Sequence, residues 1–269
     1  MSRAGRPVIT LTTDFGLTDS FVGTMKGVII SSCPEAQIVD ICHDVPPQDV
    51  LAGAIRLAAA ASYFPPGTVH LAVVDPGVGG PRRPIAIHYR DQFFVGPDNG
   101  MLCLATSGQG TWEALELTNQ ELWLKPTSST FHGRDIFAPI AAYLAGGADF
   151  GALGSPIKDP VALSVPQPDA QGPQVLGSVI DVDRFGNLIT NIRGPHLKGR
   201  SVEWVEVQGQ RINGLSTWYD PSQPLIALIA SDGWIEVAAP LGNAAQRLGV
   251  GAGESVTIRL IDDLGRSGR

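Results

Sequence analysis

In the first half of the chain, continuous apolar runs alternate with segments whose apolar residues fall on one helical face. The runs at 8–15, 37–45 and 68–74 are typical of buried strands. Between them, the spacing predicts helices over 21–29 and 48–64, the second of which is rich in alanine and ends before a pair of prolines. Strands and helices in this order predict a parallel sheet that helices cover on both faces.

Shorter segments follow this alternation. The runs 84–89 and 92–96 could form a hairpin, and 135–147 is expected to be a short helix that ends in a glycine pair. From about residue 147 to residue 173 the periodicity disappears and prolines recur, which indicates a linker. Beyond it only short strand-like runs remain, separated by Gly, Asn, Asp and Pro at intervals typical of antiparallel sheets.

These patterns predict an α/β fold class with two domains. An amino-terminal, mostly parallel sheet is sandwiched by helices, and a smaller all-β domain with an antiparallel, barrel-like sheet follows it. We assign residues 1–160 to the α/β domain, 161–173 to a proline-rich linker and 174–269 to the all-β domain.

Composition and charge exclude several classes of function. The chain has 26 acidic and 19 basic residues, and its formal net charge of −7 would repel a phosphate backbone, so no nucleic-acid partner is expected. No stretch approaches the roughly 20 apolar residues of a membrane helix, so no membrane partner is expected either. The basic residues at the start precede a strand-like alternation rather than the unbroken apolar region of a signal peptide. We therefore expect a cytoplasmic protein.

The cysteines agree with that expectation. Cys33, Cys42 and Cys103 are odd in number, which argues against a disulfide framework. Because they form no Cys-x-x-Cys pair, a thiolate zinc site is not expected either. They are interpreted as core thiols.

Polar residues follow the predicted parallel strands, at the edge where open α/β sheets bind their ligands. Asp14 ends the first strand, and its carboxylate could accept both hydroxyls of a ribose. Asp19 or Ser20 could cap the helix that follows. His43 and Asp44 end the second strand, where Asp44 could equally be a turn former.

The third strand leads into VVDPGVGGPRR, which carries an acid, Asp75, and two bases, Arg82 and Arg83, around a tight turn. Its glycines precede Pro-Arg-Arg-Pro, which cannot begin the phosphate-binding helix of a dinucleotide site. Taken alone, Asp-Pro-Gly could be an ordinary turn and the arginines a solvated surface. His132, just before a predicted helix, could be a capping or core residue.

Five motifs in order along nearly the whole chain resemble one family. The chain is similar to the S-adenosyl-L-methionine (SAM) hydroxide adenosyltransferases, or adenosine-forming SAM hydrolases, which are relatives of the fluorinase and chlorinase. The motifs are TTDFG near the start, VVDPGVG with an Arg seven residues after its Asp, GPDNG at 96–100, TFHGRDIFAP at 130–139 and DRFGNLITNI at 183–192.

The resemblance implies a reaction and an assembly. Water or hydroxide attacks the ribose C5′ of SAM and releases adenosine and L-methionine, with no cofactor besides the substrate. The family's assembly is a homotrimer, in which substrate lies between the amino-terminal domain of one subunit and the carboxyl-terminal domain of its neighbour. The family's Asp-Arg-His catalytic set falls on Asp75, Arg82 and His132, since Arg82 rather than Arg83 has the matching spacing.

The chemistry of these three groups suggests their roles. Asp75 could accept the proton of the attacking water, whereas Arg82, with a pKa above about 12, could hold Asp75 and stabilise hydroxide character. His132 could orient the water or relay its proton. The halogenating relatives are expected to have non-acidic residues where this chain has Asp75, because a carboxylate would repel a halide. We therefore predict hydrolysis rather than halogenation.

The same resemblance implies the substrate-binding residues. Asp14 should bind the ribose diol. From the neighbouring subunit, Asp183 should meet the methionine ammonium, Phe185 should stack near adenine and Asn187 should contact the adenine edge.

A closing segment, SDGWIEVAAPLGNAA, resembles the one whose Ser and Asn-Ala backbone contact methionine and adenine. It points to Ser231, Asn243 and Ala244. The spacing between GWIEVA and GNAA is longer than in the halogenating relatives, which leaves the register open. Trp234 and Glu236 within it are expected in the core or on a strand face.

Two other functions remain open from the residues alone. A non-catalytic SAM or adenosine sensor would need the binding contacts but not the Asp75–Arg82–His132 cluster. A metal-dependent hydrolase would lose its activity to a chelator. Its candidate ligands would be Asp14, His43, Asp44, Asp75, Asn99 and His132.

Overall fold

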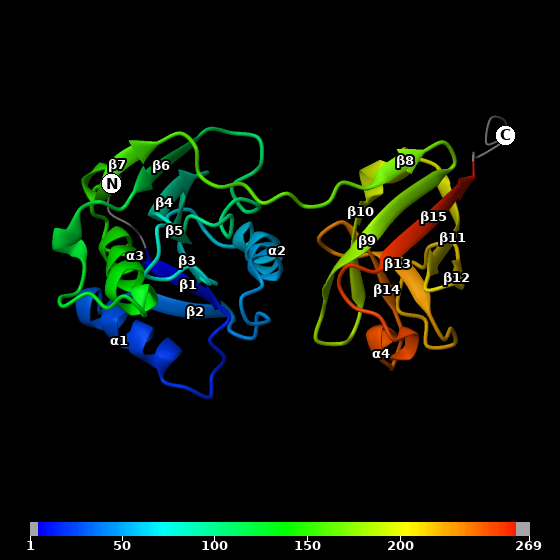
Figure 1. Cartoon of the computed structure of the whole chain (residues 1–269), viewed down its shortest axis with the longest axis horizontal. Coiled ribbons are helices and arrows are strands. Elements are labelled where there is room, and N and C mark those ends of the chain that lie inside the picture. Colours follow the sequence, from blue (N-terminus) through cyan, green and yellow to red (C-terminus); the bar gives the residue numbers. More distant parts are fainter. Residues whose placement is uncertain (1–4, 262–269) are drawn as a thin grey trace. The chain divides into compact units, whose positions relative to one another are not determined.

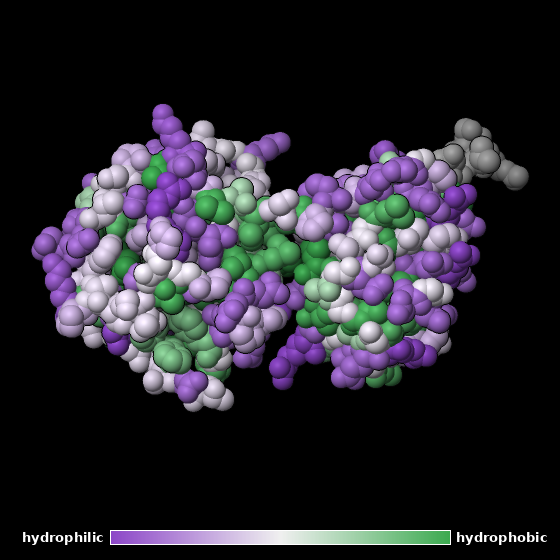
Figure 2. All heavy atoms as spheres, viewed as in Figure 1, coloured by the Kyte–Doolittle hydropathy of each residue, from purple (hydrophilic) through white to green (hydrophobic). Residues whose placement is uncertain are grey.

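The computed structural model describes residues 5–261, which divide after Leu163 into an amino-terminal unit and a carboxyl-terminal unit (Figure 1). Each unit has its own hydrophobic core. Figure 2 shows hydrophilic side chains over much of the visible surface of both, with apolar side chains in smaller patches.

The amino-terminal unit is built on one seven-stranded sheet. Its strands are β1 (Val8–Thr13), β2 (Gln37–Cys42), β3 (Val69–Val73), β4 (Pro84–Tyr89), β5 (Gln92–Pro97), β6 (Trp112–Glu116) and β7 (Ser155–Ile157). The strand order is β2-β1-β3-β5-β4-β6-β7. The first four in this order are parallel, and the rest pair antiparallel. The parallel part therefore brings the ends of β1, β2 and β3 to one edge of the sheet.

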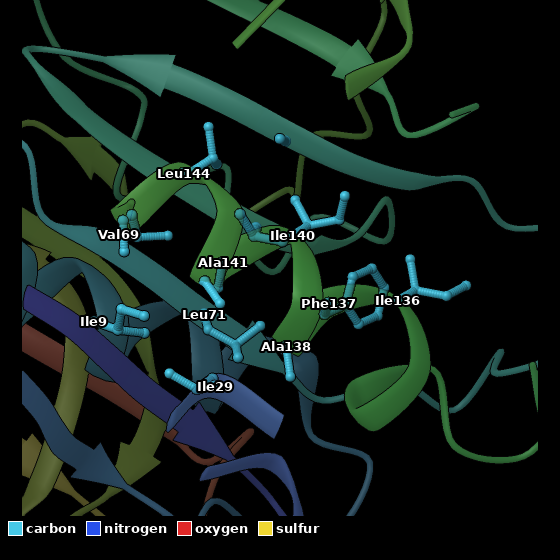
Figure 3. Close-up of a cluster of buried hydrophobic side chains, with 14 of the residues drawn as sticks. Ile9, Ile29, Val69, Leu71, Ile136, Phe137, Ala138, Ile140, Ala141 and Leu144 are labelled. Atoms are coloured by element: carbon cyan, nitrogen blue, oxygen red, sulfur yellow. The ribbon is translucent and has the colours of Figure 1, made fainter. Parts of the chain in front are cut away.

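Helices cover both faces of this sheet, as predicted. On one face, α1 (Phe21–Ser32) and α3 (Ala138–Ala145) pack on alternate residues of β1 and β3. Figure 3 shows this layer, with Ile140 and Ala141 of α3 among the labelled side chains. The opposite face packs against α2 (Val50–Ala61).

Details of these elements differ from the sequence patterns. The predicted hairpin exists as β4 and β5, which pair antiparallel. The predicted helix over 135–147 begins instead as a π-helix, η2 (Gly133–Phe137), and continues as α3. Ser20 occupies the N-cap position of α1, but no side-chain cap hydrogen bond forms there. A cap that the pattern did not single out is Asp49, which accepts from the Ala52 N–H at 2.9 Å before α2.

The carboxyl-terminal unit is an eight-stranded antiparallel sheet with one short helix, α4 (Ala244–Leu248). Its central path has the order β12-β11-β15-β9-β10-β14-β13, and β8 pairs with β9. Because the end strands β12 and β13 also contact each other, the sheet is nearly closed into a barrel. Its strands are β8 (Asp169–Gln171), β9 (Gln174–Val182), β10 (Leu188–Arg193), β11 (Ser201–Val207), β12 (Gln210–Asn213), β13 (Ile226–Ile229), β14 (Trp234–Ala238) and β15 (Ser255–Ile261).

The two-part α/β fold class with an antiparallel, barrel-like second sheet is thus confirmed. Strand β8 lies within the segment 161–173 that the proline pattern assigned to the linker. Short 3₁₀ turns complete the structure at Gln120–Leu122, Phe150–Leu153 and Gly194–Leu197. Among residues 5–261, no helix has the length and apolar character needed to span a membrane.

Candidate active site

The segment after β3 folds into a tight turn that presents Asp75. The Val78 N–H donates to the Asp75 carbonyl at 3.2 Å, and the Gly80 N–H donates to the Gly77 carbonyl at 3.0 Å. Gly79 has a φ of +74°, and a Cβ at this position would overlap the carbonyl oxygen of Ser129. Glycine is therefore needed on both conformational and steric grounds. This close approach packs the turn directly against the segment that leads to His132.

The same turn returns Arg82 to Asp75. Arg82 Nε lies 3.0 Å from Oδ1 and 3.1 Å from Oδ2 of Asp75, and Arg82 Nη2 also donates to Oδ2. The side chains are only 4% exposed for Asp75 and 10% for Arg82, so both charges are largely removed from water. The Arg82 guanidinium also lies over the Phe137 ring, 5.3 Å from its centroid. A shielded, forked pair of this kind is held in one geometry.

His132 joins this pair from the start of η2. Its Nδ1 lies 2.7 Å from Arg82 Nη2. A guanidinium has only donors, so Nδ1 must accept and the ring proton of the neutral imidazole resides on Nε2. Burial lowers the pKa of His132, and the positive charge of Arg82 lowers it further. The structure thus brings all three predicted catalytic residues into one cluster, with His132 neutral and its Nε2–H available as a donor.

The second arginine of the turn has different partners. Arg83 Nε donates to Asp98 Oδ2 at 2.8 Å, and Arg83 Nη1 donates to Asp159 Oδ1 at 3.0 Å. The neighbouring Asn99 donates from Nδ2 to the Val74 carbonyl at 2.8 Å. The GPDNG motif at the end of β5 therefore anchors both ends of the turn through Asp98 and Asn99.

Asp14 leaves the sheet at the same edge. Strands β1 and β3 are adjacent and parallel, with Thr13 opposite Val73, so Asp14 and Asp75 follow neighbouring strand ends. The Asp14 Oδ2 accepts the backbone N–H of Gln48 at 2.8 Å. Gln48 has a φ of +67°, a conformation uncommon for a residue other than glycine.

An aromatic cluster joins the segments that carry Asp14 and His132. The ring of Phe15 lies 6.1 Å from that of Phe131, centroid to centroid, and both contact Phe21. Since Phe15 follows Asp14 and Phe131 precedes His132, these contacts fix the two segments against each other. The ribose candidate and the catalytic cluster therefore belong to one edge of one unit.

The polar residues after β2, His43 and Asp44, have hydrogen-bond partners of their own. The His43 Nδ1 lies 2.8 Å from Thr13 Oγ1, and Asp44 is an exposed residue whose carbonyl accepts from Arg56. Within residues 5–261, no group of three His, Cys, Asp or Glu side chains is arranged to hold a metal ion. Within the described residues, the candidate ligands of a metal-dependent hydrolase thus have other hydrogen-bond partners and do not converge on one point.

In the carboxyl-terminal unit, Asp183 organises the turn between β9 and β10. Its Oδ1 accepts the N–H of Phe185 at 2.9 Å and that of Asn187 at 2.8 Å, and its Oδ2 accepts Asn187 Nδ2 at 2.9 Å. Asn187 is buried, whereas Phe185 is 74% exposed. A large aromatic ring held out from a rigid turn is available for stacking on a flat ligand.

Asn243 and Ala244 lie beside this turn. Asn243 caps α4, because its Oδ1 accepts the Gln246 N–H at 2.7 Å, and Ala244 is buried as the first helical residue. The Asn243 side chain occupies the space where a Cβ of Gly186 would stand, and the Ala245 N–H donates to the Gly186 carbonyl at 2.9 Å. Four of the other five predicted residues of this unit are therefore near neighbours of Asp183.

Ser231 is the exception. It lies in the turn before β14, next to the end of β10. Asn187 precedes the start of β10, and that start pairs with Val237 at the other end of β14. At roughly 3.3 Å per residue, the length of β14 places the turn that holds Ser231 about 13 Å from the turn that holds Asn187. Ser231 could contact the same ligand as Asn187 only if that ligand were extended along β14.

Glu236 and Trp234 are buried, as expected for core or strand-face positions. Tyr219 donates a hydrogen bond to Glu236 Oε1. The irregular sequence around Tyr219 did not indicate this contact. Burial raises the pKa of Glu236, the hydrogen bond from Tyr219 opposes this, and the negative charges of Asp183 and Asp232 raise the pKa further.

Comparison with known protein families agrees with the motifs. A family model described as the SAM hydroxide adenosyltransferase N-terminal domain matches residues 9–154, and the corresponding C-terminal domain matches residues 177–257. The chain belongs to the SAM hydroxide adenosyltransferase family. Matches to both family domains agree with the division of the structure into two units.

Individual relatives of the SAM hydroxide adenosyltransferase family are similar over nearly the whole chain. An (R)-S-adenosyl-L-methionine hydrolase from Salinispora tropica is 40% identical, with 95% of this chain and 98% of the relative covered. A fluorinase from Nocardia brasiliensis is more distant, at 27% identity over 95% of this chain and 97% of its own. The crystal structure of an uncharacterized conserved protein from Thermotoga maritima superimposes with a TM-score of 0.86 at 38% identity, covering 94% of this chain and 99% of that one.

Proposed function

We propose that this protein is an S-adenosyl-L-methionine hydrolase that forms adenosine and L-methionine. The observation that carries this proposal is the shielded cluster of Asp75, Arg82 and His132 beside Asp14 at one edge of the sheet. The names of the relatives at about 40% identity support the same reaction. The catalytic and binding roles given below are inferences from chemistry and from the family resemblance.

The reaction is a nucleophilic substitution at a sulfonium. A bond forms between the water oxygen and C5′ of the ribose, and the bond between C5′ and sulfur breaks. The electron pair of that bond goes to sulfur, which leaves as the neutral thioether of methionine. The water loses one proton, first to a group of the enzyme and then to solvent. No oxidant or reductant is needed.

Asp75 is the proton acceptor in this proposal. Bulk water has a pKa of about 15.7, so it must be oriented and deprotonated as it attacks. Arg82 cannot accept a proton, but it holds the Asp75 carboxylate by two forked contacts and stabilises negative charge on the attacking oxygen. Their low exposure strengthens both effects, because shielding from water reduces electrostatic screening.

His132 orients the water. Its Nδ1 is occupied by Arg82, so the ring donates from Nε2 rather than accepting the proton there. Of the two roles that the residue types left open, the hydrogen-bond direction therefore favours orientation over proton relay. The lowered pKa of His132 keeps the ring neutral, which prevents a second cation from competing with the sulfonium for the same space.

Hydrolysis is favoured over halogenation by charge. A chloride or fluoride entering beside Asp75 would meet a carboxylate that is 4% exposed and poorly screened. Water carries no such penalty. As Asp75 takes the proton, the attacking oxygen gains negative charge opposite the sulfonium, and a shielded pocket strengthens that attraction.

The substrate contacts and the assembly follow the family resemblance. Asp14 binds the ribose diol through the oxygen that Gln48 leaves free. The site is completed in a homotrimer by the carboxyl-terminal unit of a neighbouring subunit, and the three cysteines, none of them in a disulfide, suit a cytoplasmic enzyme. The contributing residues of that unit are Asp183, Phe185, Asn187, Ser231, Asn243 and Ala244.

The test is a turnover assay with a matched pair of variants. Purified protein is incubated with SAM, and adenosine is followed by chromatography. Asp75→Asn is expected to lower kcat by about 10²- to 10⁴-fold while adenosine still binds. The control is Asp159→Asn, which removes a carboxylate from Arg83 rather than from Arg82 and should leave kcat unchanged.

The alternatives give different results in the same assay. Binding of SAM without any turnover by the wild-type protein would favour a sensor. Loss of turnover on adding a chelator would favour a metal-dependent hydrolase, whereas the proposed mechanism predicts no change. Undiminished cleavage by Asp75→Asn would show that the proton acceptor lies elsewhere.

A further inference from the structure

Two buried threonine–histidine pairs tie β1 to its neighbours. Thr10 Oγ1 lies 2.7 Å from His70 Nδ1, and Thr13 Oγ1 lies 2.8 Å from His43 Nδ1. The two pairs have the same chemistry and similar burial. They differ in place, because Thr10 lies within the strand whereas Thr13 is its last residue, immediately before Asp14.

The Thr13 hydroxyl has two hydrogen-bond partners. The Phe15 N–H donates to Thr13 Oγ1 at 3.3 Å, and the same hydroxyl is hydrogen-bonded to His43 Nδ1. The backbone adds two further links, from the Gly16 N–H to the His43 carbonyl at 2.8 Å and from the Val45 N–H to the Thr13 carbonyl at 3.4 Å. These bonds hold the chain on both sides of Asp14, and none of them uses its carboxylate.

His43 is itself held from behind. Its Nε2 is buried and lies 3.2 Å from Asp40 Oδ1. Asp40 Oδ2 in turn accepts from Lys26 Nζ at 2.6 Å. The ring thus lies between Asp40 of β2 and Thr13 at the end of β1, and Lys26 of α1 holds Asp40 in turn.

The Asp14 carboxylate is restrained by one oxygen only. Its Oδ2 accepts from the Gln48 N–H, and within the described part of the chain no hydrogen bond is made to Oδ1. A carboxylate with one fixed and one free oxygen can bind a vicinal diol with little loss of conformational freedom, provided that its backbone does not move.

We infer that Thr13 and His43 are positioning residues for the ribose site, which act by fixing the backbone that carries Asp14. This inference rests on the proposed function, because it assigns ribose binding to Asp14. It gives the histidine after β2 a role that needs neither a metal ion nor contact with substrate.

The experiment compares two isosteric changes on one strand. Thr13→Val removes the hydroxyl that links Phe15 to His43, and we expect Kd for adenosine and KM for SAM to rise about tenfold, with kcat changed less than threefold. Thr13→Ser keeps the hydroxyl and should restore both values to within about twofold. Thr10→Val breaks the matched bond to His70 and should change neither Kd nor KM, whatever its effect on stability.

A ligand without the diol separates positioning from general structural damage. Wild-type protein and Thr13→Val should bind 2′,3′-dideoxyadenosine equally, because the effect acts only through Asp14 and the hydroxyls. If Thr13→Val does not fold, His43→Leu removes the same hydrogen bond from the other side and should give the same pattern.

Each outcome has a distinct meaning. If Thr13→Val weakens adenosine and dideoxyadenosine equally, or weakens neither, the inference is overturned. Asp14→Asn provides the separate check on the proposed function. If that variant binds adenosine as tightly as the wild type, the ribose assignment fails at Asp14 itself. If Asp14→Asn weakens adenosine but Thr13→Val does not, only the positioning role is wrong.

Discussion

At the scale of single residues, the two adjacent arginines of the turn show how neighbours acquire different tasks. Successive residues of an extended segment point in opposite directions. Arg82 therefore faces Asp75 and His132, whereas Arg83 faces Asp98 and Asp159. Residue type could not distinguish the two arginines, and the family spacing alone pointed to the one that contacts Asp75.

Replacing each arginine by lysine should separate these tasks. Arg82→Lys keeps the charge but loses the planar fork whose Nε and Nη2 contact Asp75 and His132 from separate atoms. The loss of charge-assisted hydrogen bonds worth about 1.5–3 kcal/mol predicts a fall in kcat of roughly 10- to 150-fold. Arg83→Lys should lower stability by about 1 kcal/mol and leave kcat unchanged. Steady-state kinetics and urea unfolding of both variants measure the difference, and equal losses of kcat would contradict it.

At the scale of elements, the catalytic turn connects strands that do not pair with each other. β3 lies between β1 and β5, whereas β4 lies between β5 and β6, so the turn must cross the end of β5. Asp98 and Asn99 at that end hold the turn through Arg83 and Val74. A loop in such a position is fixed by its surroundings rather than by its own sequence.

Gly79 should be the most sensitive residue of this turn. Alanine there would have a positive φ and would also overlap the Ser129 carbonyl. We expect Gly79→Ala to cost about 3 kcal/mol or more of unfolding free energy and to lower kcat at least about tenfold. Gly147→Ala is the control, because Gly147 has a φ of +86° with nothing within 4 Å, and it should cost only about 1 kcal/mol. Comparable losses in the two variants would show that the contact with Ser129 is unimportant.

Elements defined by apolar periodicity were predictable from the sequence. The parallel strands, the covering helices and the β4–β5 hairpin all follow from local patterns of burial. The π-helix before α3 was not predictable in this way, because a π-helical turn has no signature in the local sequence pattern. The Thr13–His43 pair was missed because it joins residues far apart in the chain. The cap at Asn243 was missed because it serves a helix of only five residues.

At the scale of the whole molecule, each unit has its own core, and the amino-terminal core contains a titratable group. His70 is fully buried between Phe94, on which it stacks with centroids 4.8 Å apart, and Phe64. Burial lowers the pKa of His70 to about 4. The folded protein therefore holds this ring neutral at pH values where the unfolded chain binds a proton.

Stability should fall in acid because of His70. Above the unfolded pKa of about 6.5, His70 is neutral in both states and costs no stability. As pH falls from there toward about 4, the unfolded chain binds a proton that the folded protein does not. The free energy of unfolding therefore falls by on the order of 3 kcal/mol. His70→Gln does not titrate, so its urea midpoint should depend less on pH across this window. Midpoints measured from pH 7 to pH 4 for both proteins provide the test. Parallel curves would mean that His70 does not contribute to acid sensitivity.

The single wide turn at Gly133–Phe137 has a consequence for how this fold can change over time. Shortening it by one amino acid would give α3 a regular beginning, and the backbone hydrogen bonding would improve. It would also swing His132 through roughly 100° about the helix axis, away from Arg82. The number of residues in this turn therefore keeps His132 beside Arg82, and a lineage that loses one of them loses the imidazole from the site in a single step.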